Sequence, residues 1–443
     1  MTSPSSDQVP ALTERQPSAE GLAVSGRHRP RVLLLMSPAT YRAGAFLEAA
    51  NRLGIDAIQG VDLPPALAPE TDQVLAFDLS RATTGAHIAS IAMKRAIDAV
   101  LAVDDSATLA AAHANAALGR PHNDPESALA ARDKWIMREA FRRGGVPVPH
   151  YEHFPITSDP EQVARRVPYP CVIKPLRLSG SRGVIRADHP EGFIAAWNRT
   201  RRLLLDEEAA DPETTSILVE SFIPGFEVAL EGLLIDGRLE VLAIFDKPDP
   251  LDGPFFEETI YTTPSRLPVA TQDLVAVRTA QAAAAVGLRV GPVHAELRVN
   301  DEDVWPIELA GRSIGGLCSS VLEFGAGMSL EELILRQAVG YPIESTTRSG
   351  GAAGVMMIPI PKRGMLRSVD GIDQALAVPG ITGLEITARL NYPIIPLPEG
   401  ASYLGFIFAR GDSPAAVEAA IREAHSHLTI RIDPMLGVQP VRG

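Results

Sequence analysis

The chain has 443 residues, of which 46% are apolar and 21% charged, and a formal net charge of −13. This length suffices for about three domains with cores of their own, and the negative charge argues against a nucleic-acid surface, which needs clustered Lys and Arg. Two cysteines, Cys171 and Cys318, cannot build a disulfide framework and favour a reducing compartment. Since no uncharged apolar run approaches the ~18 residues of a membrane span and no signal peptide is recognisable, we expect a cytoplasmic protein without membrane or nucleic-acid partners.

The first part of the chain alternates buried strands with helices. Residues 1–30 are rich in Ser, Pro and charge and are expected to form a disordered leader. Between residues 31 and 118 the expected elements are strand 32–36, helix 41–53, strand 55–58, strand 74–77, helix 88–95, strand 99–103 and helix 107–118. This alternation predicts a Rossmann-like domain with a doubly wound parallel sheet. Its first turn, Ser37 to Thr40, has no glycine, which excludes a dinucleotide site; a role for that turn in holding a substrate stays open.

The next segment, 119–345, begins with helices and reaches a strand that ends in a lysine. Ser127 is expected to cap the helix that contains Lys134. Strand 171–173 places Lys174 at its end, and a loop of small residues follows. Such a loop lets backbone N–H groups approach an anion, although it lacks the spacing of a Walker P-loop. The small residues of this loop are Ser179, Gly180, Ser181 and Gly183.

A strand, a hinge and a hairpin come after this loop. Strand 217–221 passes through a hinge into a second strand, 227–235, and Asp236-Gly237 predicts a tight turn into strand 238–245. Helix 271–286 is expected to end at a glycine, Gly287. The loop 248–264 before this helix carries Glu257, Glu258 and Tyr261.

The hairpin between residues 293 and 316 brings two carboxylates together. Residues 293–299 alternate between apolar and polar, which places His294 and Glu296 on one face of a strand. If the turn pairs Asn300 with Val304, Glu296 falls opposite Glu308, with Cβ atoms ~4.5–5.5 Å apart.

Carboxylates at that distance call for a cation between them. Arg312, just past the second strand, could aim its guanidinium at an anion held there. The alternative is a surface hairpin whose charges face water. His294 is either a substrate contact or a hydrogen-bonded core histidine.

The last segment, 346–443, is expected to be a small α+β subdomain of ~90 residues, within the usual domain range. It follows a helix at 330–339. Its expected elements are strands 355–360, 381–388 and 403–410, helix 414–425 and strand 427–432.

Four stretches, in this order, resemble the ATP-grasp enzymes, and the chain is most similar to the L-amino-acid ligases among them. They are Asp133-Lys134 with the Gly-Val-Pro-Val-Pro after it, Val172-Ile173-Lys174-Pro175 with its loop, Val219 to Glu227, and Glu296 with Glu308 and Arg312. The resemblance runs from about residue 31 to the C-terminus. It implies an ATP-grasp fold, α/β and α+β, with an N-terminal doubly wound parallel-sheet domain and a C-terminal α+β subdomain.

The resemblance also implies roles for individual residues. Lys134 and Lys174 would bind ATP phosphates under the loop of Ser179, Gly180, Ser181 and Gly183. The hinge residues Glu220, Ser221, Phe222 and Ile223 would hold adenine, and Glu227 the ribose unless it faces solvent. Glu296 and Glu308 would coordinate Mg²⁺, with Mn²⁺ as the alternative ion, and Arg312 would act in catalysis on the transferred phosphate. Many relatives have Asn where this chain has Ala310, which leaves the number of metal ions open.

The function implied is an ATP-dependent ligase that joins a carboxylate, an amino acid, to an amine through an acyl phosphate. Candidate contacts to these small-molecule substrates are Glu257, Glu258, Tyr261, His294, Gly315 and Gly316, the two glycines leaving room for a bulky group. The family resemblance makes a homodimer a reasonable expectation. Two alternatives stay open: a carboxylase-like enzyme that phosphorylates bicarbonate, and a nucleotide-binding protein without turnover.

Overall fold

The computed structural model describes residues 29–64, 71–81, 83–206 and 214–435. The expected leader therefore lies almost entirely outside the described residues. Within these ranges, every helix is too short or too polar to traverse a lipid bilayer.

The N-terminal domain contains a parallel sheet with the strand order β3-β2-β1-β4. All apolar residues of its first strand are fully buried, because Leu33 and Leu35 pack on one face and Val32 and Leu34 on the other. This confirms the doubly wound arrangement. The elements are β1 Arg31–Met36, α1 Ala43–Leu53, β2 Asp56–Asp62, β3 Val74–Phe77, α2 Thr84–Lys94, β4 Ala99–Ala102, a 3-10 turn Asp105–Ala107 and α3 Thr108–Leu118.

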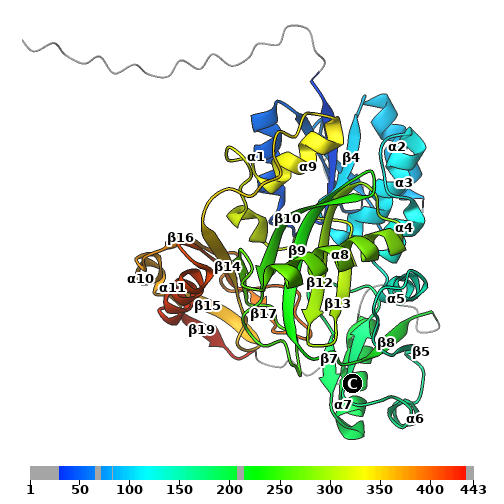
Figure 1. The fold of residues 1–443 in the computed structure, drawn as a ribbon, viewed down its shortest axis with the longest axis vertical. Coiled ribbons are helices and arrows are strands. Elements are labelled where there is room, and N and C mark those ends of the chain that lie inside the picture. Colours follow the sequence, from blue (N-terminus) through cyan, green and yellow to red (C-terminus); the bar gives the residue numbers. More distant parts are fainter. Residues whose placement is uncertain (1–28, 65–70, 82, 207–213, 436–443) are drawn as a thin grey trace, which may run out of the picture.

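A short helical segment connects this domain to a four-stranded lobe, at the lower right of Figure 1. The lobe has the strand order β5-β8-β6-β7. The aromatic rings of Phe193 and Trp197 on α7 pack on Ile173 and Ile217 of its sheet. The elements are α4 Pro125–Ala130, α5 Lys134–Arg143, β5 Tyr151–Pro155, α6 Pro160–Ala164, β6 Cys171–Pro175, β7 Ile185–Ala187, α7 Pro190–Asp206 and β8 Ser216–Ser221.

The cap expected for the lysine helix is wrong. Ser127 lies inside α4, and α5 begins at Lys134 with Asp133 as its N-cap, whose carboxylate accepts the backbone N–H of Trp135 at 3.1 Å. Asp is among the strongest N-cap residues, so the chain divides the expected helix into two.

The centre of the molecule is an antiparallel sheet with the strand order β13-β12-β9-β10-β11-β14-β18-β16. Asp236 and Gly237 turn β9 into β10 with φ angles of +52° and +85°, as a two-residue hairpin requires. Helix α8 covers one face together with α5. The elements are β9 Phe226–Ile235, β10 Arg238–Asp246, β11 Ile260–Thr263, α8 Val269–Val286, β12 Gly291–Val299, β13 Val304–Ala310, a 3-10 turn Cys318–Val321 and α9 Leu330–Val339.

The C-terminal segment extends this central sheet. Strand β14 pairs with β11, and β18 and β16 follow outward, so the strands of the expected α+β subdomain are continuous with the central sheet. A small sheet, β17-β15-β19, completes the region. The elements are β14 Ala352–Ile358, β15 Gly364–Asp370, α10 Ile372–Leu376, β16 Ile381–Ile386, β17 Pro393–Ile394, β18 Gly405–Gly411, α11 Pro414–Ser426 and β19 Thr429–Asp433. The boundaries at residues 118 and 345 stay predictions.

Candidate active site

A pocket opens between the four-stranded lobe and the central sheet. One wall comes from β6, β8 and the hinge after β8, and the other from β9, β12 and β13. The lining residues are Lys134, Val172, Lys174, Leu178, Ser181, Val184, Glu220, Ser221, Phe222, Ile223, Glu227, Phe256, Glu296, Arg298, Ile307 and Glu308. Most residues expected to bind ATP or metal therefore share one cavity.

Lys134 lies at the junction of three elements of this pocket. Its side chain is 5% exposed, and its Nζ donates to the backbone oxygen of Leu178 at 2.9 Å and to Oε1 of Glu308 at 3.3 Å. The helix α5, the small-residue loop and the strand β13 therefore meet at one ammonium group.

Lys174 is held by a buried ion network rather than by solvent. Its Nζ lies 2.6 Å from Oε2 of Glu220, whose other oxygen accepts from Arg138. Burial opposes ionisation of Glu220, yet the charges of Arg138 and Lys174 lower its pKa to about 2. Arg138 also donates to the backbone oxygen of Ile307 on β13 at 2.6 Å. The carboxylate of Glu220 is thus committed to Lys174 and Arg138.

The small-residue loop crosses the rim of the pocket. Ser181 lines the cavity, whereas Gly183 anchors the loop with a φ of +73° and no room for a side chain, since an added Cβ would lie 2.7 Å from Pro175. The backbone N–H of Gly183 donates to the oxygen of Pro398 at 2.8 Å. Gly180 has open space around it.

The two hairpin carboxylates lie side by side as expected, but by a different route. The turn pairs Val299 with Val304, one residue out of the expected register, and a bulge at Ile307 restores the pairing of Glu296 with Glu308. Glu296 is 21% and Glu308 30% exposed at the side chain, so both reach the cavity from the sheet.

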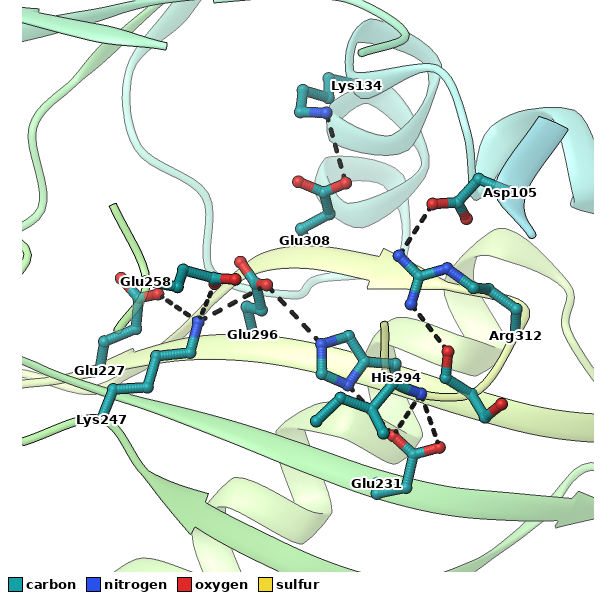
Figure 2. A network of polar contacts seen from close by, with 12 residues as sticks. Asp105, Lys134, Glu227, Glu231, Lys247, Glu258, His294, Glu296, Glu308 and Arg312 are labelled. Atoms are coloured by element: carbon teal, nitrogen blue, oxygen red, sulfur yellow. Dashed lines mark hydrogen bonds and ion pairs between the residues drawn. The ribbon is translucent and has the colours of Figure 1, made fainter. Parts of the chain in front are cut away.

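A third and fourth acid complete this region around one lysine (Figure 2). The Nζ of Lys247 lies 2.8 Å from Glu227, 2.5 Å from Glu258 and 3.5 Å from Glu296. Burial opposes the charge of Lys247, but these carboxylates raise its pKa well above the ordinary value. One carboxylate oxygen each of Glu227, Glu258 and Glu296 lies within 4.8 Å of the others.

This donor set fits a hard divalent cation. Mg²⁺ prefers oxygen ligands and takes one or two carboxylates together with phosphate oxygens, which Glu296 and Glu308 on adjacent strands provide at the pocket wall. Glu258, expected among the substrate contacts, shares Lys247 with Glu296.

His294 is a buried link between Glu296 and the loop after β13. Its Nδ1 lies 3.1 Å from Glu231 and its Nε2 3.6 Å from Glu296. Burial opposes protonation, but hydrogen bonding to the two carboxylates raises the pKa of His294 to about 9. Glu231 also accepts the backbone N–H of Ile314 at 3.0 Å. Figure 2 thus shows a continuous chain of contacts from Glu296 on β12 to the loop after β13.

Arg312 binds an acid of the N-terminal domain rather than either of the two hairpin acids. Its Nη2 lies 2.8 Å from Asp105 of the N-terminal domain, and its Nη1 donates to the backbone oxygen of Ser313 at 2.8 Å. Burial opposes ionisation of Asp105, but the adjacent Arg312 lowers its pKa. The guanidinium of Arg312 is therefore ion-paired through one nitrogen, Nη2, whereas Nη1 binds only a backbone oxygen.

The remaining expected substrate contacts lie outside the cavity. Tyr261 belongs to strand β11 rather than to the loop, with its ring 5.1 Å from Nζ of Lys247. Glu257 is half-buried, and among the described residues it forms no hydrogen bond or ion pair; burial raises its pKa. Gly315 has open space beside it, whereas an added Cβ on Gly316 would lie 3.0 Å from the Phe406 ring.

Two models of protein families match the chain. One is described as an ATP-grasp domain and matches residues 167–321, and the other as L-amino acid ligase C-terminal domain 2 and matches residues 356–433. The chain therefore contains an ATP-grasp domain. The residues of the pocket that come from the lobe's β6 and β8, the hinge and the central sheet fall within the first match.

Named relatives support this ATP-grasp assignment. Alanine–anticapsin ligase of Bacillus subtilis is 26% identical over 56% of this chain and 55% of its own length, and the formate-dependent phosphoribosylglycinamide formyltransferase of Mycolicibacterium gilvum is 30% identical over 48% and 51%. The chain thus spans about half the length of these curated relatives. The L-amino acid ligase of Bacillus licheniformis superposes with a TM-score of 0.79 at 24% identity, over 92% of this chain and 100% of that one, which establishes the fold.

Sequence reasoning missed several residues in or next to this pocket. Lys247 and Glu231 are buried polar residues that only the strand order brings to Glu296 and His294. Arg298 binds Glu227 at 3.0 Å and stacks on Phe222 at 5.1 Å. A signal for Lys247 existed, because a charged pair, Asp246-Lys247, directly follows the apolar strand end.

Proposed function

We propose that the chain is an ATP- and Mg²⁺-dependent ligase that joins the carboxylate of an amino acid to an amine and releases ADP and phosphate. The observation that carries the proposal is the convergence of Lys134, Lys174, Glu296 and Glu308 on one pocket. This set offers cations for phosphates beside carboxylates for a divalent ion, as phosphoryl transfer requires.

The proposed reaction has two steps. A carboxylate oxygen of the amino acid bonds to the γ-phosphorus while the bond to the β–γ bridging oxygen breaks, giving an acyl phosphate and ADP. The amine nitrogen then bonds to the carbonyl carbon, the bond from that carbon to the phosphate oxygen breaks, and the nitrogen loses a proton. An amide and inorganic phosphate remain.

The chain's own cations position the phosphates in this scheme. Lys134 and Lys174 act as point charges on phosphate oxygens, and each is already oriented, Lys134 by Glu308 and Lys174 by Glu220. Glu296 and Glu308 would hold Mg²⁺, which would neutralise charge on the transferring phosphate. Mn²⁺ has similar ligand preferences.

Arg312 is the proposed catalytic arginine. Its planar fork matches a phosphate or carboxylate, and Asp105 holds it at 2.8 Å. Asp105 orients this guanidinium before the acyl phosphate is present.

The substrate's ammonium group is assigned to Glu257. Its carboxylate has no protein partner among the described residues and lies beside Glu258, which is committed to Lys247. Even a half-buried carboxylate without a partner is costly, and a ligand ammonium would relieve that cost. Tyr261 and His294 are assigned to holding other site residues, since they contact Lys247 and Glu296, respectively. Gly315 and Gly316 are assigned to the border of the substrate site.

Water must be kept from the acyl phosphate, because hydrolysis would uncouple ATP use from amide formation. The loop with Ser179, Gly180, Ser181 and Gly183 lies at the rim of the pocket and is anchored at Gly183. We assign it the covering role, which is a common use of such loops. Two buried free thiols, Cys171 and Cys318, suit a cytoplasmic setting. The homodimer expected from the family would be detected by light scattering.

The test is an assay of ADP and phosphate release with panels of paired amino acids, with products identified by mass spectrometry. We expect ADP formation that requires both partners and a product mass equal to the two substrates minus one water. AMP as product, or no nucleotide turnover with any carboxylate and amine, would contradict the proposal. ADP formation that depends on bicarbonate alone would instead favour the carboxylase-like alternative, and ADP binding without turnover the regulatory one.

A further inference from the structure

Lys247 is the most enclosed ammonium group of the site. Its side chain is 3% exposed, and it contacts carboxylates from three elements: Glu227 on β9, Glu258 in the loop before β11 and Glu296 on β12. It does not line the pocket. An ammonium at this depth cannot reach a phosphate without leaving its three partners.

The ammonium of Lys247 occupies the place that a cation would take among these acids. One oxygen each of Glu227, Glu258 and Glu296 lies within 4.8 Å of the others, and Lys247 contacts all three acids. Arg298 adds a second positive charge at 3.0 Å from Glu227. Without Lys247, the three oxygens would face one another without the ammonium, and such a group binds divalent cations.

The phosphate side of the pocket has an excess of positive charge. Lys174 and Arg138 share the single carboxylate of Glu220, and Lys134 is paired with Glu308. The group around Glu220 therefore carries one positive charge in excess. An anionic metal–nucleotide complex is attracted by this arrangement, whereas a free divalent cation is repelled or not attracted.

We propose that Lys247 is an internal counter-ion that takes the place of a cation among Glu227, Glu258 and Glu296, so that the site accepts its divalent cation together with nucleotide phosphates and not as a free ion. Lys247 is a positioning residue in this account, since it also fixes the carboxylate of Glu296. The inference rests on the proposed function. A purely structural ion pair would instead affect stability and leave metal preference unchanged.

The experiment titrates the full-length chain with Mn²⁺, whose free-ion electron paramagnetic resonance signal falls on binding. We expect wild type to bind Mn²⁺ poorly alone and tightly with ADP, after correction for Mn²⁺–ADP in solution. Lys247→Met should bind Mn²⁺ alone at least about tenfold more tightly than wild type, because one positive charge a few ångströms from a divalent ion is removed. Lys247→Arg should behave as wild type.

Controls make each outcome decisive. Lys94→Met removes an exposed lysine of α2 and should leave Mn²⁺ binding unchanged. Lys247→Gln, with circular dichroism to confirm folding, serves if Lys247→Met is unstable. Unchanged or weaker Mn²⁺ binding by the neutral variants, or wild type binding Mn²⁺ alone as tightly as with ADP, would overturn the inference. If wild type bound no ADP even with Mn²⁺, the proposed function itself would fail.

Discussion

Glu308→Gln is the substitution that separates catalysis from folding most cleanly. The amide keeps the size of the side chain, and its oxygen can still accept from Nζ of Lys134, now at 3.3 Å from the carboxylate. Because Lys134, which is 5% exposed, also donates to the backbone oxygen of Leu178 at 2.9 Å, it keeps hydrogen-bond partners and we expect the variant to fold. One of the two opposed metal carboxylates is lost, however, and with it a fixed charge at the transferring phosphate. Removal of one such preorganised group costs about 10²–10³ in kcat, or roughly 3–4 kcal/mol of transition-state stabilisation.

The assay is steady-state ADP release at varied Mg²⁺, with calorimetric binding of ADP as the second readout. We expect kcat to fall at least about 10²-fold, the Mg²⁺ requirement to rise, and measurable nucleotide binding to remain. Glu302→Gln is the matched control, because Glu302 is an exposed acid in the turn of the same hairpin, and it should retain full turnover. Unchanged turnover in Glu308→Gln would refute the metal assignment.

Three further predictions concern single side chains. Lys174→Met should weaken ADP binding by about tenfold or more, because a phosphate charge partner is lost; calorimetry measures this, and wild-type affinity would exclude the role. Arg312→Lys should lower kcat by at least about tenfold with little change in folding, since lysine lacks the planar fork; equal kcat would contradict it. For His294, whose pKa is raised from 6.5 to about 9, the stabilising charge is fully present below pH 6.5 and is lost as pH rises through 9. The unfolding free energy of wild type should therefore fall relative to that of His294→Asn by about 3 kcal/mol across that window. Denaturant titrations without metal or nucleotide measure this difference. A difference between the two proteins that does not change with pH would refute the charged His294.

Local patterns were sufficient to predict the elements that position the site. The continuous apolar run of β1 indicated a buried parallel strand, and Gly287 ended α8 in the left-handed conformation as expected. The pairing of Glu296 with Glu308 was predicted on the wrong turn register, and the bulge at Ile307 compensated the error. Because a one-residue slip turns the side chains of a strand to the other face, the two acids share a face only through this bulge.

The partners of the site residues could not be predicted, because they depend on strand order and domain placement. Lys247 meets Glu296 only because β9 lies between β10 and β12. Asp105 contacts Arg312 from the N-terminal domain, 207 positions earlier in the chain. For the same reason, the C-terminal strands could be recognised as strands but not as an extension of the central sheet.

The central claim is that ATP phosphorylates a carboxylate, and transfer of an isotopic label tests it most directly. The chain would be incubated with ATP, Mg²⁺ and a mixture of amino acids labelled with ¹⁸O in the carboxyl group, and the released phosphate analysed by mass spectrometry. An acyl phosphate places one carboxylate oxygen on phosphorus, so we expect one ¹⁸O in each phosphate formed together with amide product. ADP formation with unlabelled phosphate, or label recovered in AMP, would contradict this account.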